Sequence, residues 1–291
     1  MKNIIKIQFC LLFVFAFVFT SFAQEKKLSG KLEGFKLNSK LMSREMPYRV
    51  ILPVNYNQND ESSRYPVIYL LHGLTGHFDN WADKTKLSEY AANYKYIIVM
   101  PEGNDGWYSD SATVPNDKYE SYIVQELIPE IDKKFKTNPN REGRSIAGLS
   151  MGGYGSLKFG LKYPEKFVLA GSFSGALGAA SWSVKSLGNG WKVLTDSIAS
   201  VYGEDESQTR KDNDIYKMAR EITPEKIKSL PFLYVDCGLE DGLIQQNRDF
   251  TNILVEKKIP HEFRQLPGKH DWKFWDSQVV EFLELTTKFI K

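Results

Sequence analysis

The chain has 291 residues, of which 38 are lysine or arginine and 36 are aspartate or glutamate. A formal net charge of +2 gives no indication of nucleic acid or another polyanion as a partner. With 42% hydrophobic residues and two cysteines, the composition excludes a disulfide-rich scaffold and is typical of one large α/β domain.

The first 23 residues have the three regions of a secretory signal peptide. Two early lysines precede an apolar run over residues 9–19, and small residues follow it up to Ala23. We predict cleavage after Ala23, a mature protein of residues 24–291 and a secreted or periplasmic location. The alternative is an uncleaved membrane anchor, but an apolar run of eleven residues is short against the ~20 that span a bilayer.

Short apolar stretches alternate with segments of helical spacing along the mature chain. The predicted strands are residues 32–37, 48–52, 66–71, 96–100, 145–149, 167–173, 232–235 and 261–266. The predicted helices are residues 81–94, 119–135, 154–163, 243–256 and 272–289. This alternation predicts an α/β fold with a mostly parallel, doubly wound sheet. The first two strands are expected to form an antiparallel pair at one edge.

Residues 175–229 interrupt the alternation after the sixth predicted strand. The segment is rich in glycine, contains Trp182 and Trp191, and becomes highly charged up to Lys228. Long insertions of this kind commonly carry functional loops. We predict that residues 175–229 form a cap over the site.

Residues 148–155 read Gly-Leu-Ser-Met-Gly-Gly-Tyr-Gly and join a predicted strand to a predicted helix. The G-x-S-x-G pattern is typical of a nucleophile elbow, because a serine in a sharp turn needs neighbours without Cβ atoms. The helix that follows would direct its first N–H groups toward a developing oxyanion. The alternative is a glycine-rich turn in which the serine only caps the helix. Ser150 is therefore a candidate nucleophile. The assignment depends on finding a base and an acid elsewhere in the sequence.

A His72-Gly73 dipeptide follows the predicted strand 66–71. In doubly wound sheets, ligands bind at the carboxyl ends of the strands. Hydrolases of this architecture take one oxyanion donor from this loop and the other from the residue after the nucleophile. We predict that the backbone N–H groups of Leu74 and Met151 form the oxyanion hole. The alternative is a tight turn in which His72 hydrogen-bonds to its own loop.

The acid and the base are expected after later strands, in the chain order serine, acid, histidine. His270 follows the predicted strand 261–266 and precedes the last predicted helix, so it is the candidate base. A surface histidine is the alternative interpretation. Asp236 and Asp241 both follow the predicted strand 232–235, each could be a plain helix cap, and spacing alone does not choose between them.

Several motifs occur together in one order along residues 45–285. They are His72-Gly73-Leu74, residues 107–110, residues 120–131, residues 148–155, residues 236–243 and residues 268–272. In this combination the chain resembles the putative-esterase family of α/β-hydrolases, which includes esterase D (S-formylglutathione hydrolase), feruloyl esterases, tributyrin esterases and mycolyltransferases. The resemblance implies an α/β-hydrolase fold and a Ser150-His270-Asp241 triad, because Asp241 matches the second aspartate of the family's D-x-G-x-x-D pattern.

The resemblance also implies an enzyme, a serine hydrolase of carboxylic esters that works without a cofactor. No metal site is expected, since the four histidines show no H-x-x-x-H spacing. Export makes a cytosolic thiol substrate unfavourable, so we favour feruloyl or acetyl esters of plant polysaccharides over an S-formylglutathione hydrolase-like thioesterase. The aromatic side chains predicted to contact the substrate are Trp107, Tyr108, Trp182 and Trp272.

Two other classes of protein remain as alternatives. A prolyl oligopeptidase-like serine peptidase shares the G-x-S-x-G-G-Y pattern, but it carries a propeller domain that this chain lacks. A catalytically silent carbohydrate-binding protein can have the same fold, because fold alone does not confer activity.

Overall fold

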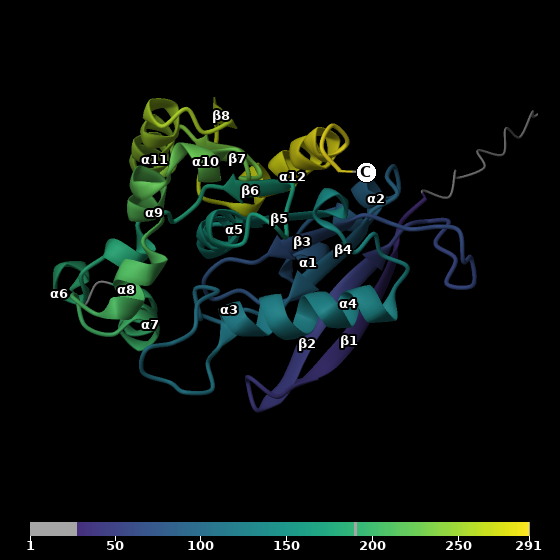
Figure 1. The fold of residues 1–291 in the computed structure, drawn as a ribbon, viewed down its shortest axis with the longest axis horizontal. Helices are drawn as coiled ribbons and strands as arrows, with labels where there is room; N and C mark the ends of the chain where they lie inside the picture. The colour runs from purple at the N-terminus through teal and green to yellow at the C-terminus, as the bar shows by residue number, and fades with distance from the viewer. Residues whose placement is uncertain (1–27, 189–190, 291) are drawn as a thin grey trace, which may run out of the picture.

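The apolar segments of the chain form one eight-stranded sheet with helices on both faces (Figure 1). The computed structural model describes residues 28–188 and 191–290, so the predicted signal peptide lies outside the described residues. The strands are β1 (Lys31–Ser39), β2 (Arg44–Leu52), β3 (Val67–Leu71), β4 (Ile97–Pro101), β5 (Arg144–Leu149), β6 (Leu169–Phe173), β7 (Phe232–Gly238) and β8 (His261–Leu266).

The sheet has the order β1-β2-β4-β3-β5-β6-β7-β8. β1 pairs antiparallel with β2 at one edge, and β2 pairs antiparallel with β4. All other neighbours are parallel. The predictions of a mostly parallel sheet and of an antiparallel pair at its edge are therefore confirmed.

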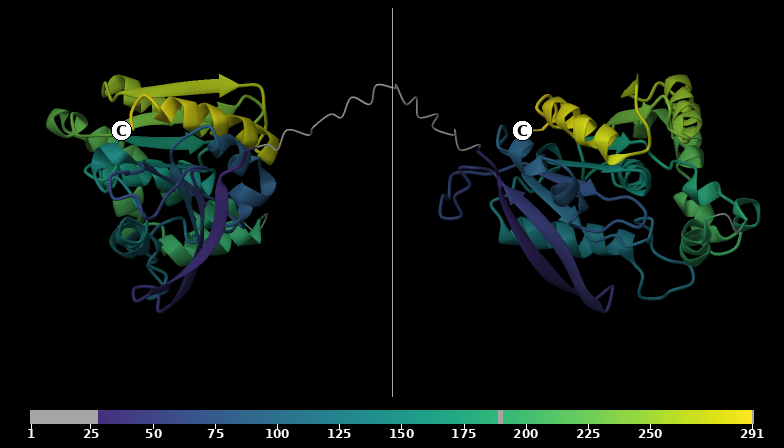
Figure 2. Two further views of the ribbon diagram at one scale, coloured as in Figure 1. Left: turned by 90° about the vertical axis from the view of Figure 1, so that its right-hand side faces the viewer. Right: turned by 180° about the vertical axis from the view of Figure 1, so that it is seen from behind.

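The helices cover the two faces of the sheet, as the two views of Figure 2 show. They are α1 (Asn80–Lys84), α2 (Leu87–Ala91), α3 (Tyr119–Ser121), the π-helix η1 (Tyr122–Leu127), α4 (Ile128–Lys134), the 3-10 turn η2 (Arg141–Gly143), α5 (Met151–Lys162), α11 (Ile244–Glu256) and α12 (Trp272–Thr286). Buried side chains of α4, α5 and α11 join one hydrophobic cluster, and those of α1, α2 and α12 join a second.

The alternation of side chains along the central strands supplies both clusters. Val67 and Tyr69 of β3 belong to the first cluster, whereas Ile68 and Leu70 belong to the second. Every residue of β3 is buried. A strand between two helical layers is apolar on both faces, which is why its sequence reads as a continuous apolar run.

The prediction of one continuous helix over residues 81–94 is wrong, because the structure has two short helices there. The chain is extended at Thr85, with φ −135° and ψ 174°, and this residue separates α1 from α2. The Lys86 N–H donates to the Asp276 carboxylate of α12 over 3.0 Å, and the Leu87 N–H donates to Thr85 Oγ1 over 3.1 Å. Contacts with a helix 190 residues away in sequence therefore divide a segment whose local pattern is helical.

The predicted helix 119–135 is continuous but not uniformly α-helical. It consists of α3, η1 and α4, and the Ile128 N–H donates to the Ile123 carbonyl, five residues back. The widened turn comes directly before Pro129, which has no N–H to donate.

In residues 175–188 and 191–229, the predicted cap consists mainly of short helices. It contains η3 (Ala179–Ser181), α6 (Val184–Leu187), α7 (Lys192–Tyr202), α8 (Gln208–Asn213), α9 (Ile215–Glu221) and α10 (Pro224–Ile227). Helices α6, α7 and α8 project from the body of the molecule at the left of Figure 1.

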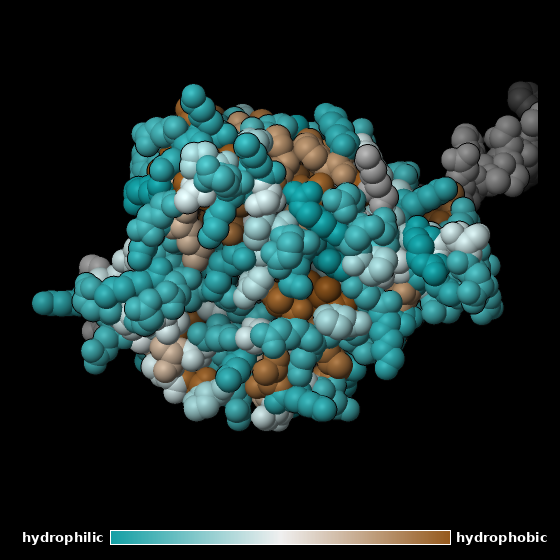
Figure 3. Space-filling model, in the orientation of Figure 1, coloured by the Kyte–Doolittle hydropathy of each residue, from teal (hydrophilic) through white to brown (hydrophobic). Residues whose placement is uncertain are grey.

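The surface shown in Figure 3 is largely hydrophilic, with apolar side chains in scattered patches. Within the described ranges, no helix combines the length and the apolar character needed to cross a membrane.

The order of the sheet determines where a ligand can bind. β4 lies on one side of β3 and β5 lies on the other, so the chain changes direction across the sheet at β3. The loops that leave the carboxyl ends of β3 and β5 therefore meet at a topological switch point, which is the general binding position in doubly wound sheets. These loops contain His72-Gly73 and Ser150.

Candidate active site

Ser150 occupies the turn between β5 and α5 in a strained conformation. Its backbone has φ 53° and ψ −114°, a region that side chains rarely adopt. The Ser150 N–H donates to the Phe173 carbonyl over 2.9 Å, and the Ser150 carbonyl accepts from the Ala176 N–H over 3.0 Å. Both contacts tie the turn to the end of β6 and the residues just after it, which holds the strained serine in place.

Two glycines make this turn possible. A Cβ atom at Gly148 would lie 2.6 Å from the backbone of Gly152, and a Cβ atom at Gly152 would lie 2.6 Å from the carbonyl oxygens of Leu71 and His72. The strand, the turn and the loop after β3 therefore approach at backbone distance. This close packing explains the glycines on either side of the serine in the G-x-S-x-G pattern.

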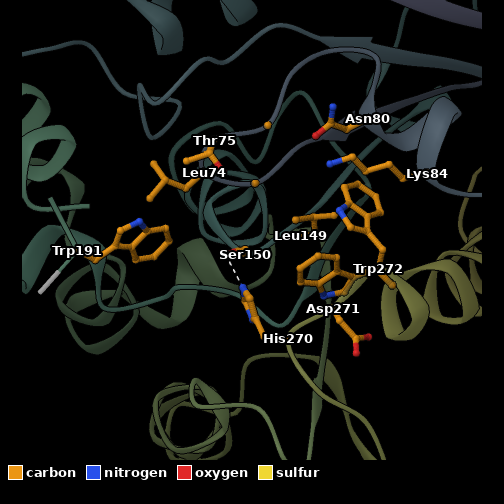
Figure 4. A pocket seen from close by; sticks show the side chains of 13 residues that line it. Leu74, Thr75, Asn80, Lys84, Leu149, Ser150, Trp191, His270, Asp271 and Trp272 are labelled. Atoms are coloured by element: carbon orange, nitrogen blue, oxygen red, sulfur yellow. Dashed lines mark hydrogen bonds between the residues drawn. The ribbon is translucent and has the colours of Figure 1, made fainter. Parts of the chain in front are cut away.

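His270 joins Ser150 to Asp241 through two hydrogen bonds. Its Nε2 lies 3.0 Å from Ser150 Oγ, and its Nδ1 lies 2.9 Å from Asp241 Oδ2 (Figure 4 shows the first contact). The imidazole packs edge-on against the Trp275 ring, with centroids 4.9 Å apart. A histidine that bonds a hydroxyl on one side and a carboxylate on the other is placed to accept the hydroxyl proton.

The loops that carry Asp241 and His270 are bonded to each other. The Leu239 N–H donates to the Leu266 carbonyl over 2.8 Å, and the Glu240 N–H donates to the Gly268 carbonyl over 3.0 Å. These bonds extend the pairing of β7 and β8 beyond the strands. The separation of the acid and the base is thus set by the backbone.

Asp241 is held in its charged form. Its side chain is fully buried, and Oδ1 accepts the Leu243 N–H over 2.8 Å. Burial acts to raise the pKa of Asp241, but the hydrogen bond and the charge interaction with His270 outweigh it, and the net pKa lies below the ordinary value. The carboxylate can therefore orient the His270 ring and stabilise its protonated form.

Asp236, the other candidate acid, is on β7 and does not contact His270. It is fully buried, and burial raises its pKa well above the ordinary value. Its backbone carbonyl accepts the Ser174 N–H over 2.8 Å. The structure thus brings Asp241, rather than Asp236, to the histidine.

The loop after β3 lies against Ser150. A Cβ atom at Gly73 would be 3.4 Å from Ser150 Cβ. In the described part of the chain, neither the Leu74 N–H nor the Met151 N–H donates a hydrogen bond. Both predicted oxyanion donors are thus adjacent to Ser150 in the fold or in sequence, with their N–H groups available.

His72 holds this loop from within the protein. Its Nδ1 lies 2.8 Å from the Gly73 carbonyl, and its Nε2 accepts the Gly103 N–H over 2.9 Å. The Glu102 carboxylate lies 3.2 Å from the same nitrogen. Burial acts to raise the pKa of Glu102, but the interaction with His72 lowers it to about 2. The alternative prediction, that His72 bonds to its own loop, is therefore correct for the side chain.

Asp105, from the loop after β4, fixes Thr75, the residue that follows Leu74. Thr75 has a positive φ of 60°, and its N–H donates to Asp105 Oδ1 over 2.7 Å. The Gly76 N–H donates to the Gly73 carbonyl over 3.0 Å. The peptide that carries the Leu74 N–H is thus held on both sides.

A pocket of about 330 Å³ opens beside Ser150 (Figure 4). It is lined by Gly73, Leu74, Thr75, Gly76, Asn80, Lys84, Leu149, Ser150, Trp191, His270, Asp271, Trp272 and Trp275. Trp272 and Trp275 come from α12, Asn80 and Lys84 come from α1, and Trp191 comes from the predicted cap. Of the four predicted substrate contacts, only Trp272 lines this pocket.

The structure does not bring Trp107 and Tyr108, two of the predicted substrate contacts, to this pocket. Their exposed fractions are 1% and 0%. Trp107 Nε1 donates to Ser197 Oγ over 3.0 Å, and its ring packs against Trp182. Trp182 is partly buried and lies outside the pocket lining. These rings fasten the predicted cap to the sheet domain, because aromatic side chains bury large apolar surfaces.

Sequence reasoning missed a buried ion pair beneath these rings. Lys158 Nζ is fully buried and lies 2.7 Å from Glu120 Oε2, and it donates to the Tyr108 carbonyl over 2.7 Å. Burial lowers the pKa of Lys158 to about 8. The sequence does contain an indication of this ion pair, because Lys158 falls on an otherwise apolar face of α5. No cluster of His, Cys, Asp or Glu in residues 28–188 and 191–290 is placed to hold a metal ion.

Comparison with known proteins identifies the family of this fold and site. A family model described as "Putative esterase" matches residues 39–285. The chain belongs to this esterase family. It is 30% identical over 261 residues to an acetyl esterase of Caldicellulosiruptor saccharolyticus, and the match covers 86% of this chain and 96% of the relative.

Solved structures agree with the esterase family. The fluorophosphonate-binding serine hydrolase FphF of Staphylococcus aureus superposes with a TM-score of 0.78 at 27% identity, over 89% of this chain and 98% of FphF. A ferulic acid esterase superposes with a TM-score of 0.76 at 26% identity, over 90% of this chain and all of the esterase. The predictions of an α/β-hydrolase fold and of a carboxylic ester hydrolase are therefore confirmed.

Proposed function

We propose that the protein is a serine esterase that uses Ser150, His270 and Asp241 as a catalytic triad. The observation that carries the proposal is the position of His270, whose two ring nitrogens lie 3.0 Å from Ser150 Oγ and 2.9 Å from Asp241 Oδ2. The strained backbone of Ser150 presents its hydroxyl at the pocket.

In the first half of the reaction, Ser150 Oγ attacks the ester carbonyl carbon while His270 Nε2 takes the hydroxyl proton. The tetrahedral oxyanion is stabilised by the Leu74 and Met151 N–H groups, and one such donor is worth about 3 kcal/mol in related chemistry. The protonated His270 then gives its proton to the leaving alcohol, and an acyl-serine remains.

In the second half, His270 takes a proton from water, and the hydroxide attacks the acyl carbon. Collapse of the second tetrahedral intermediate returns the proton to Ser150 Oγ and releases the acid. Asp241 remains ionised throughout and stabilises the imidazolium. The lowered pKa of Asp241 supports this role.

For the substrate, we propose acetyl or feruloyl esters of plant polysaccharides, cleaved by a protein exported through residues 1–23. The relatives named acetyl esterase and ferulic acid esterase support the acyl groups. Three tryptophans at the pocket, Trp191, Trp272 and Trp275, support a substrate with a flat ring or sugar face.

The test is an activity screen of the mature protein with acetyl, butyryl and feruloyl esters, a thioester and dipeptide anilides. We expect oxygen esters to be cleaved fastest, and a fluorophosphonate probe to label the wild type but not Ser150→Ala. Faster cleavage of an anilide would support a peptidase, and faster cleavage of a thioester would support the S-formylglutathione hydrolase-like alternative. Absence of Ser150-dependent labelling would support the silent carbohydrate-binding protein.

A further inference from the structure

One wall of the pocket beside Ser150 carries a positive charge. Lys84 and Asn80, both from α1, line the pocket opposite Trp191. Figure 4 shows the ammonium end of Lys84 directed toward the interior of the pocket, above the Trp272 ring. Lys84 Nζ lies 5.2 Å from the centre of the Trp272 ring, which is cation–π distance.

The ring beneath this ammonium is held in place by two other rings. Trp272 meets Trp81 edge-on at a centroid distance of 5.4 Å, and it meets Trp275 edge-on at 5.3 Å. Trp81 is 1% exposed, and its Nε1 donates to the Leu71 carbonyl over 2.9 Å. Lys84 therefore rests on a platform anchored in the core, rather than extending freely into solvent.

The ammonium has no anionic partner within the described ranges. Two acidic side chains near the junction of α1 and α2 have partners of their own. Asp83 pairs with Arg49 over 2.5 Å, and Asp276 accepts the Lys86 N–H. At the pocket lining itself, Asp271 caps α12 by accepting the Phe274 N–H over 3.0 Å.

A lysine that lines a pocket without an acidic partner can bind an anion of the ligand. On the basis of the esterase activity proposed above, we propose that Lys84, resting on Trp272, binds a carboxylate carried by the substrate. The enzyme then prefers carboxylate-bearing esters to neutral esters of the same shape. The carboxylate can be on the acyl chain or on the alcohol, for example on an acidic sugar, because the ester carbonyl at Ser150 has one group on each side.

Two pairs of synthetic esters separate these sources. For the acyl side, the pair is 4-nitrophenyl hydrogen adipate and its methyl ester. For the alcohol side, the pair is 4-acetoxybenzoate and its methyl ester. The quantity compared is the ratio of kcat/KM within a pair, measured for the wild type and then for Lys84→Met. Dividing the two ratios cancels the intrinsic reactivity of each ester.

In at least one pair, Lys84→Met is expected to reduce the preference for the anionic ester roughly fivefold, as for an exposed ion pair. Lys84→Arg keeps the charge and should keep most of the preference. Lys133→Met, an exposed substitution on α4 away from the pocket, controls for net charge and should change nothing. The preference should also weaken at 1 M salt, where the Debye length is about 3 Å.

Equal ratios for the wild type and Lys84→Met in both pairs would overturn the inference but leave the esterase proposal intact. An equal loss of preference in Lys133→Met would also overturn it, because net charge alone would then be the cause. Failure of the wild type to hydrolyse any of the four esters, together with no Ser150-dependent labelling, would instead overturn the proposed function itself.

Discussion

The Tyr108 hydroxyl donates a hydrogen bond of 3.0 Å to the backbone carbonyl of His72. This bond joins the loop after β4 to the loop after β3, which carries the proposed oxyanion donor at Leu74. Tyr108 is fully buried and adopts a positive φ of 50° to make the contact. Tyr108 therefore lies behind the loop that carries this proposed donor, where it positions the backbone.

Replacement of Tyr108 by phenylalanine is expected to lower both stability and turnover. The His72 carbonyl would be left buried without this donor, at a cost of about 1–3 kcal/mol in the free energy of unfolding. Because the loop loses an anchor, kcat should fall more than KM changes. Urea denaturation and steady-state kinetics measure the two effects.

The control for this substitution is Tyr90→Phe, which removes a hydroxyl bonded to Asp276 on the α2 side of the protein. It should change the free energy of unfolding by at most about 0.5 kcal/mol. If Tyr108→Phe behaves like Tyr90→Phe in both assays, the oxyanion loop does not depend on Tyr108.

The two candidate acids allow a matched comparison. Asp241→Asn keeps the shape of the side chain but cannot hold His270 in the tautomer that accepts the Ser150 proton, and kcat should fall by roughly 10⁴-fold. Asp236→Asn replaces a buried group whose pKa is already raised and which does not contact His270, so kcat should stay within about tenfold.

Circular dichroism would show that both variants are folded before the rates are compared. A folded Asp236→Asn protein that loses more activity than Asp241→Asn would show that the acid is assigned to the wrong residue.

The buried ion pair of Glu120 and Lys158 should make the stability of the protein depend on pH. Burial acts to raise the pKa of Glu120, but Lys158 and Lys162 lower it to about 2, against an ordinary value of 4.5. A carboxylate with a depressed pKa in the folded state contributes stability that is fully present above the unfolded pKa and is lost as pH falls toward 2. Glu120→Gln should remove this part of the pH dependence.

At pH 7, Glu120→Gln should also lower the free energy of unfolding by about 3–5 kcal/mol, because Lys158 is left buried without its carboxylate. Denaturation curves at pH 7 and pH 3 test both effects, since the difference between wild type and variant should shrink at pH 3. A difference that stays constant between the two pH values would contradict the linkage.

Much of the fold could be predicted from the sequence, because buried parallel strands are apolar on both faces. All eight predicted strands are present, and the order of the motifs along the chain placed Ser150 and His270 at the correct ends of β5 and β8. The choice between Asp236 and Asp241 required the resemblance, since both follow the predicted strand 232–235 and only the backbone bonds between the two loops decide which one reaches His270.

The parts that the sequence did not predict depend on distant contacts. The division of α1 from α2 involves Asp276, and the burial of Tyr108 depends on the His72 carbonyl and on Lys158. An aromatic residue near a catalytic motif has the same local pattern whether it contacts substrate or supports a loop. Burial in the folded protein distinguishes the two roles for Trp107 and Trp272.

Trp191 and Trp182 provide a final test of which aromatic side chains meet the substrate. Trp191 lines the pocket and is 53% exposed, whereas Trp182 packs edge-on against Trp107 with centroids 5.8 Å apart. Trp191→Ala should raise KM for a feruloyl ester about threefold to tenfold, as expected for one lost aromatic contact, and should leave KM for an acetyl ester unchanged. Trp182→Ala should lower the melting temperature and leave both KM values unchanged, because its ring supports the predicted cap from outside the pocket. Since both substitutions remove the same side chain from the same segment, a rise in KM with Trp182→Ala alone would mean that substrate binds on the Trp182 side of the segment.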